Sequence, residues 1–104
     1  MNPENGGKIE LRLADSSAES ATYAISLQTA LASFEGDVAV AATGTGQVTF
    51  GAWRIEPLGT MPVDAPPTWL VAVARAALKA ALRTSQAEGR WPRRITRWRS
   101  EPSE

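Results

Sequence analysis

Hydrophobic and charged residues alternate near the start of the chain. From Lys8 to Leu13, every second residue is a large aliphatic one, and the residues between them are charged. A period of two places the aliphatic side chains on one face and the charged ones on the other. The pattern predicts a strand with one buried face and one charged, open face.

The next segment, from Ser16 to Gly36, favours a helix over a strand. Ser16 and Glu19 have the spacing of a capping box, and Gly36 has the place of a C-terminal cap. At a helical period, six side chains share one arc of about 120°: Tyr23, Ala24, Leu27, Ala30, Leu31 and Phe34. A rival interpretation as a strand exists, because Tyr23, Ile25 and Leu27 also alternate. The cap signals and the longer helical match favour the helix.

Two further strands are predicted in the middle of the chain. Residues 37–42 are short, apolar and partly β-branched, and 43–46 supply a glycine-rich turn. Residues 47–56 carry four large apolar side chains that change parity at Gly51. A β-bulge at Gly51 would place all four on one face.

The clearest predicted element is a helix over about 65–88, after a loop with four prolines at 57–67. Alanine, the best helix former, recurs throughout it, and Gly89 follows as a cap. Arg75, Lys79 and Arg83 repeat every fourth residue on the face opposite the apolar one.

The last segment, 90–99, fits either an edge strand or a basic tail. The predicted order is therefore β-α-β-β-α, and residues 90–99 would add a sixth element if they form a strand. This is the plan of the ferredoxin-like α+β fold, with two helices packed on one face of a three- or four-stranded, mainly antiparallel sheet. Residues 8–99 would form a single domain between a disordered N-terminus, 1–7, and a frayed C-terminus, 100–104.

Composition removes several kinds of chemistry. The chain of 104 residues has no cysteine and no histidine. These are the commonest ligands of zinc and copper, and histidine is the commonest general base. We therefore expect no metal, no cofactor and a non-enzymatic role, although carboxylate chemistry is not excluded. No apolar run is long enough to span a membrane, and we expect a small soluble, cytoplasmic protein.

Charge is divided unevenly between the two parts of the chain. Residues 1–64 carry three basic and eight acidic residues, a net charge of −5, whereas 65–104 carry eight basic and three acidic residues, a net charge of +5. The asymmetry fits either attraction between the two parts or an anionic partner for the basic part.

The basic part contains the candidate binding surface: Arg90, Trp91, Arg93, Arg94, Arg97, Trp98 and Arg99, with Arg75, Lys79 and Arg83 as an extension. Arginine binds phosphate and tryptophan stacks on bases, a combination that suits single-stranded nucleic acid. An edge strand with protective arginines and core tryptophans has the same sequence.

Comparison with the RNA-recognition motif limits the nucleic-acid hypothesis. That motif shares the predicted element order and stacks bases on aromatics of its first and third strands. Here the predicted strand at 8–13 has no aromatic residue, and the one at 47–56 lacks a basic start. Binding to nucleic acid would then use backbone contacts rather than base recognition.

Two functional hypotheses follow. The first is a non-enzymatic interaction module with an unspecified protein partner, and its surface would be the exposed edge of the second or last strand, or an unburied Trp53 with Ile55. The alternative is backbone binding of single-stranded RNA or DNA through 90–99. The position of the tryptophans separates them: exposed Trp91 and Trp98 would favour nucleic acid, and an exposed Trp53 would favour a protein.

Overall fold

The computed structural model of the protein describes residues 6–42 and 46–100. The described part has six strands and one helix: β1 Gly6–Ser16, β2 Ser20–Thr29, β3 Ala32–Ala41, β4 Gln47–Phe50, β5 Arg54–Pro57, α1 Thr68–Glu88 and β6 Arg94–Ser100. The predicted fold of two helices on a three- or four-stranded sheet is therefore wrong.

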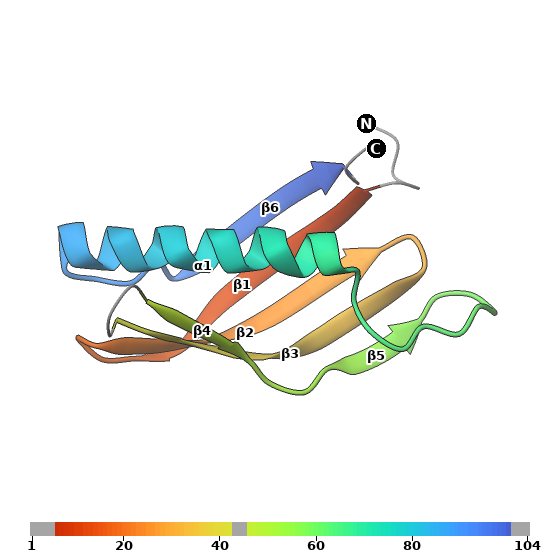
Figure 1. The fold of residues 1–104 in the computed structure, drawn as a ribbon, viewed down its shortest axis with the longest axis horizontal. Coiled ribbons are helices and arrows are strands. Elements are labelled where there is room, and N and C mark those ends of the chain that lie inside the picture. The colour runs from red at the N-terminus through yellow and green to blue at the C-terminus, as the bar shows by residue number, and fades with distance from the viewer. Residues whose placement is uncertain (1–5, 43–45, 101–104) are drawn as a thin grey trace.

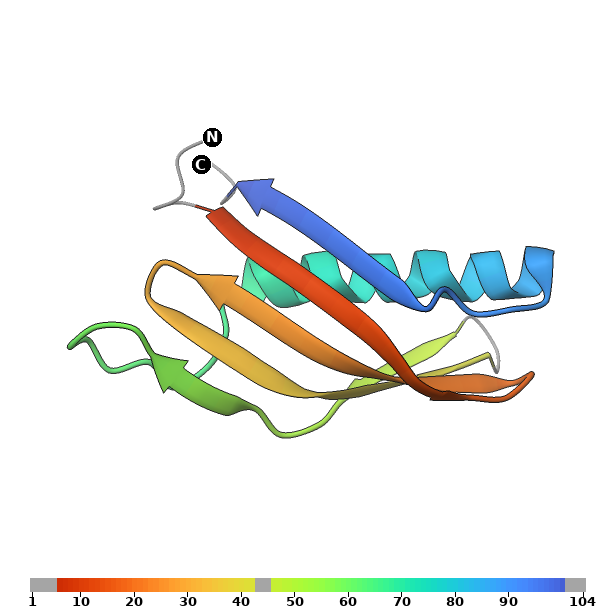
Figure 2. The same cartoon turned by 180° about the vertical axis from the view of Figure 1, so that it is seen from behind.

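All neighbouring strands of the sheet are antiparallel. Their order is β4-β3-β2-β1-β6, and β5 pairs with β3 beyond the end of β4. The last strand thus pairs with the first, and the sheet has one edge at β6 and the other at β4 and β5 (Figure 1). The single helix lies across one face of the sheet and leaves the other face open (Figure 2).

The segment expected to be the first helix is the β2–β3 hairpin. In β2 the buried residues are Ala21, Tyr23, Ile25 and Leu27, every second position, so the rival strand interpretation is correct. Three residues of the proposed helical arc, Ala24, Ala30 and Leu31, are exposed instead. Every second side chain of the hairpin packs in the core between the sheet and α1. This tertiary packing outweighs the local preference for a helix.

The residues expected as helix caps have other places: Ser16 ends β1, Glu19 lies in the β1–β2 turn and Gly36 lies inside β3. The hydroxyl groups of Ser17 and Thr29 close the turns between the strands. Ser17 Oγ accepts hydrogen bonds from the backbone N–H groups of Glu19 and Ser20, at 3.3 and 3.2 Å. Thr29 Oγ1 does the same for Leu31 and Ala32, at 3.2 Å each. A hydroxyl group that satisfies free backbone donors is needed equally at a turn and at a helix start, which explains the misassignment.

The strand predicted at 47–56 is divided into β4 and β5. Phe50 pairs with Val38 and Arg54 with Glu35, so three residues of this segment face two of β3. The extra residue lets Val48, Phe50, Trp53 and Ile55 all pack on the core. Gly36 makes room for the crossing, since a Cβ atom there would lie 2.8 Å from the carbonyl oxygen of Ala52.

Helix α1 confirms the helix predicted from alanine content and periodicity. It ends at Glu88, and Gly89 adopts φ 76°, the left-handed conformation that favours glycine. Its buried residues are Leu70, Ala74, Ala77, Leu78, Ala81, Leu82 and Ser85. These small and aliphatic side chains pack on the alternating apolar positions of the sheet to form a single core.

The C-terminal segment, left open between a strand and a tail, is strand β6. At the N-terminal end of the described chain, β1 begins at Gly6, so Gly6 and Gly7 belong to this strand and are buried. A Cβ atom at Gly7 would lie 2.9 Å from the side chain of Leu70 in α1. The expectations for 1–5 and 101–104 lie outside the described residues.

Candidate functional site

Strand β6 carries most of the candidate surface, and its position follows from its pairing with β1. Arg94 lies opposite Arg12, Thr96 opposite Glu10 and Trp98 opposite Lys8. On the other side of β6 no strand follows in the described part of the chain. The segment is thus an edge strand that carries three arginines among its seven residues.

The backbone of β6 alternates between the two sides of the strand. The N–H group of Leu13 donates to the carbonyl of Arg93, which makes these two a hydrogen-bonded pair. In an antiparallel ladder such pairs recur at every second residue. The N–H and C=O groups of Arg94, Thr96 and Trp98 therefore point away from β1, toward the free edge.

Two arginines cover two of these three outward carbonyl groups, those of Thr96 and Trp98. Arg97 Nη1 donates to Thr96 O at 2.9 Å, and Arg99 Nη1 donates to Trp98 O at 2.8 Å. Each arginine thus binds the carbonyl of the residue directly before it. Because both contacts are local, they can open without disturbing any other part of the fold. We call the outward backbone of β6, with Arg97, Trp98 and Arg99, the β6 edge.

The tryptophans of the candidate surface differ in accessibility. Trp98 is 54% exposed on the open face, and Lys8 Nζ lies 5.6 Å from the centre of its ring. Trp91 is buried, and its Nε1–H donates to Ser17 O at 2.9 Å. Trp91 is therefore a structural residue that fixes the start of β6 to the β1–β2 turn, and only Trp98 offers a face for stacking.

Trp53, the marker of the protein-binding hypothesis, is half-buried. It packs on the core, and its ring stacks on Phe50 with the ring centres 5.9 Å apart. The apolar sheet face that an exposed Trp53 would have formed is therefore not present among the described residues. The tryptophans alone do not separate the two hypotheses.

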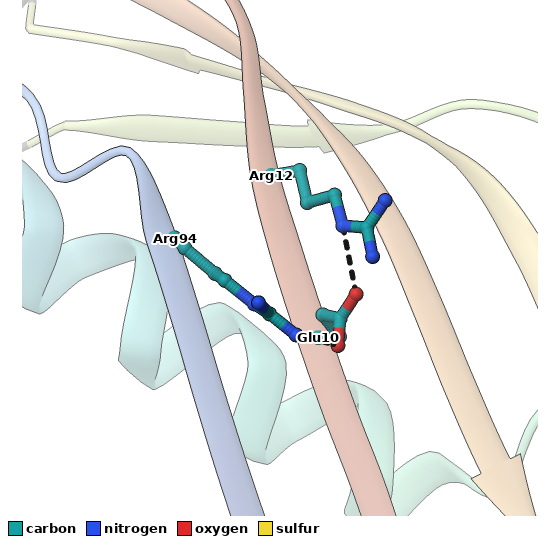
Figure 3. Close-up of polar contacts among 3 residues, drawn as sticks. All are labelled: Glu10, Arg12 and Arg94. Carbon is teal, nitrogen blue, oxygen red and sulfur yellow. Dashed lines mark hydrogen bonds and ion pairs between the residues drawn. The ribbon is translucent and has the colours of Figure 1, made fainter.

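Arg94 is occupied by an ion pair. Its Nη2 lies 2.9 Å from Glu10 Oε2, and Arg12 Nε lies 2.8 Å from Glu10 Oε1 (Figure 3). The hydrogen bond from Arg94, assisted by the charge of Arg12, holds the pKa of Glu10 below its usual range. One carboxylate thus partly neutralises two arginines, which weakens this part of the open face as an anion site.

The other arginines near β6 differ from Arg94 in their exposure and in their ion pairs. Arg90, Arg93 and Arg99 are exposed and Arg97 is half-buried. Within 6–42 and 46–100, no carboxylate lies within ion-pair distance of any of the four. Arg97 and Arg99 have the same parity as buried Ile95, so their side chains leave the strand on the helix side, whereas Trp98 lies on the open face.

The second basic group does not extend this surface. Arg75 Nη1 donates to Val48 O at 3.2 Å, and its guanidinium lies 5.2 Å from the centre of the Phe50 ring. Both partners belong to β4, the edge of the sheet opposite β6. Lys79 and Arg83 are exposed further along α1. The predicted continuous basic surface is therefore divided between the two edges.

A hollow of about 850 Å³ lies where α1 ends, between the β1–β2 turn and the loop into β6. Its lining includes Ser17, Ser85, Glu88, Arg90 and Arg93. The carbonyl end of α1 and Glu88 make this place unfavourable for an anion. The charge of Glu88 and the carbonyl end of the helix therefore weaken Arg90 and Arg93 as an anion site.

Further features place limits on the chemistry of the described residues. Among them, no cluster of acidic side chains is suited to hold a metal ion. No helix in 6–42 and 46–100 is long and apolar enough to cross a membrane. The sequence suggested the edge of the last strand as one protein-binding surface, but it could not give the direction of the backbone groups there, because that direction depends on strand register.

Comparison with known proteins gives no relative. No family model matches the chain, and neither a curated protein nor a solved structure resembles it significantly. The function of the chain is therefore inferred from its own geometry.

Proposed function

We propose that the protein is a non-enzymatic interaction module that binds an extended segment of a partner protein along the β6 edge. In this mode, called β-augmentation, the partner adds a strand to an exposed sheet edge and makes main-chain hydrogen bonds with it. The observation that carries the proposal is the outward backbone of Thr96 and Trp98, which within the described part of the chain is covered only by the neighbouring Arg97 and Arg99.

The contrast between the two edges of the sheet supports this choice. At β4 the outward carbonyl of Val48 accepts from Arg75, which reaches it from α1 and is held against Phe50. At β6 the covering groups come from the strand itself. Natural proteins protect sheet edges from unwanted pairing, and cover that comes from the strand itself, rather than from α1, supports β6 over β4 as the edge for a partner.

The absence of cysteine and histidine supports a binding role over catalysis. The cytoplasmic location expected from the sequence belongs to this proposal. A second candidate is the backbone of single-stranded RNA or DNA, favoured by the exposed ring of Trp98 beside Lys8. It is the weaker candidate, because Trp91 is buried and Arg94 is paired with Glu10.

The test is a selection of seven-residue peptides from a random library on the immobilised chain, with Thr96→Pro as the matched variant. Proline removes the outward N–H group of Thr96 but no hydrogen bond to β1, and proline is tolerated on edge strands. Peptides that bind the wild type, fail on Thr96→Pro and slow amide hydrogen exchange at Thr96 and Trp98 would support the proposal.

Two outcomes would contradict protein binding at this edge. Peptides that bind both proteins equally would place the site elsewhere. Failure of the selection, together with salt-sensitive amide shifts at Trp98 on addition of a 12-nucleotide single-stranded RNA, would favour the nucleic-acid candidate.

A further inference from the structure

The β6 edge has a charge pattern that restricts which strand can pair with it. The side chains of Arg97 and Arg99 leave the strand on the helix side, and Trp98, between them, is exposed on the open face. In a strand added beside β6, each side chain lies next to the one directly opposite, with Cβ atoms about 5 Å apart. Three consecutive partner residues would thus face a basic, an aromatic and a basic side chain.

We propose that the partner segment is an acidic strand with the pattern acidic–apolar–acidic, its carboxylates opposite Arg97 and Arg99 and its apolar residue opposite Trp98. This inference rests on the proposed function and specifies the chemistry of its ligand. The pattern is independent of strand direction, because it reads the same from either end.

Binding of such a strand exchanges one set of hydrogen bonds for another. In the free protein the guanidinium groups of Arg97 and Arg99 bind the outward carbonyls of Thr96 and Trp98. The N–H groups of an added strand take over these carbonyls, and the released guanidinium groups become available to the carboxylates. Charged arginine–carboxylate contacts replace the local contacts, so the arginines act as protection of the empty edge and as ligands of the filled one.

The same charges act against pairing with a second copy of this chain. A β6–β6 contact would bring together two strands that each carry Arg94, Arg97 and Arg99. Like charges on adjacent strands destabilise a sheet. Only Arg94 has a compensating carboxylate, Glu10, among the described residues. The edge is thus selective for an acidic partner over itself.

The test uses two seven-residue peptides in amide NMR titrations of the full chain. One has glutamate at every second position with valine or threonine between, and the other has glutamine in place of each glutamate. We expect the acidic peptide to bind about fivefold more tightly at low salt, with the difference shrinking at higher salt because exposed ion pairs are screened. The shifts should be largest at Thr96 and Trp98.

Three variants distinguish the effect of side-chain charge from the effect of main-chain docking. The double variant Arg97→Gln with Arg99→Gln should bind both peptides equally, whereas Lys79→Gln with Arg83→Gln, which changes net charge equally on α1, should keep the preference. Thr96→Pro should abolish binding of both peptides.

The outcomes separate this inference from the proposed function. If both peptides bind with equal affinity and shift Thr96 and Trp98, the acidic pattern is wrong and the docking edge stands. If neither peptide moves these amides at millimolar concentration, the docking edge itself is contradicted. Concentration-dependent dimerisation that Thr96→Pro removes would overturn the argument against self-pairing.

Discussion

Arg75 and Val48 join the helix to the far edge of the sheet: the guanidinium Nη1 donates a hydrogen bond of 3.2 Å to the backbone carbonyl. The same guanidinium lies over the Phe50 ring, 5.2 Å from its centre. A side chain of α1 thus covers the free edge of β4 and stabilises the contact between the two layers.

Replacing Arg75 by alanine should lower the free energy of unfolding by about 1 kcal/mol, since one hydrogen bond and one partly exposed cation–π contact are lost. Lys79→Ala is the matched control, an exposed basic residue one helical turn away, and should change stability by less than about 0.5 kcal/mol. Urea denaturation measures both. Equal effects would mean that Arg75 contributes only its helix propensity.

The stability of the protein at high pH should depend on Tyr23. Burial raises its pKa to about 12, and its hydroxyl donates to Pro92 O at 2.7 Å. The folded state therefore retains a proton that the unfolded state loses near pH 10. The stabilising contribution is complete below pH 10 and decreases as pH rises toward 12, by about 2 kcal/mol in total.

Tyr23→Phe gives the test of this pH dependence. At pH 7 the variant should be less stable than the wild type by about 1 kcal/mol, because the hydrogen bond to Pro92 is lost. By pH 12 the order should reverse, since phenylalanine has no proton to lose. Chemical denaturation at both pH values measures the difference, and a difference that does not change with pH would contradict the assignment.

Glu10 should contribute to stability in the opposite pH range. Its pKa is lowered by the hydrogen bond from Arg94 and the charge of Arg12, so its contribution is present above its ordinary pKa of 4.5 and is lost as pH falls below that value. We expect Glu10→Gln to be less stable than the wild type at pH 7 and equally stable in strong acid. A constant difference across this range would show that the charge of Glu10 is unimportant.

The two tryptophans of the C-terminal segment should respond differently to truncation. Trp91 is buried and donates to Ser17 O, so Trp91→Ala should cost about 3–5 kcal/mol. Trp98 is 54% exposed, and Trp98→Ala should cost less than about 1 kcal/mol. Thermal unfolding compares them, and acrylamide should quench the fluorescence of Trp98 more readily. Similar costs would mean that Trp98 belongs to the core.

Gly36 should tolerate no side chain. A Cβ atom there would lie 2.8 Å from Ala52 O, a backbone atom that cannot move independently, so Gly36→Ala should cost about 1–3 kcal/mol. Gly59→Ala, where a Cβ atom meets nothing within 4 Å, should stay within about 0.5 kcal/mol. Urea denaturation measures both variants, and equal stability of the two would contradict a close contact between Gly36 and Ala52.

Local patterns were sufficient for some elements of the fold. Helix α1 was predictable because alanine content, apolar periodicity and Gly89 all agree, and the strand at Lys8–Leu13 because its alternation has no helical equivalent. The β2–β3 hairpin was not predictable in this way, since Tyr23 and Leu27 satisfy a helical and a strand period together. Only the packing of this segment between β1 and β4 decides between the two.

The candidate site was predictable in its composition but not in its geometry. The sequence identified Arg90–Arg99 as a basic and aromatic segment, and this segment lies mostly in β6. The burial of Trp91, the pairing of Arg94 with Glu10 and the separation of Arg75 from β6 depend on contacts between residues distant in the sequence. No local pattern contains that information.

The pairing of β6 with β1 has a consequence for biosynthesis. The ribosome adds about 5–20 residues per second, so roughly 4–16 s pass between completion of β1 at Ser16 and emergence of Arg94. During this interval the nascent hairpins lack their closing strand, and we expect the pairing of β6 with β1, which joins residues far apart in the sequence, to form late in folding. A partner strand that adds to β6 would repeat, at the new edge of the sheet, the step that the chain itself makes last.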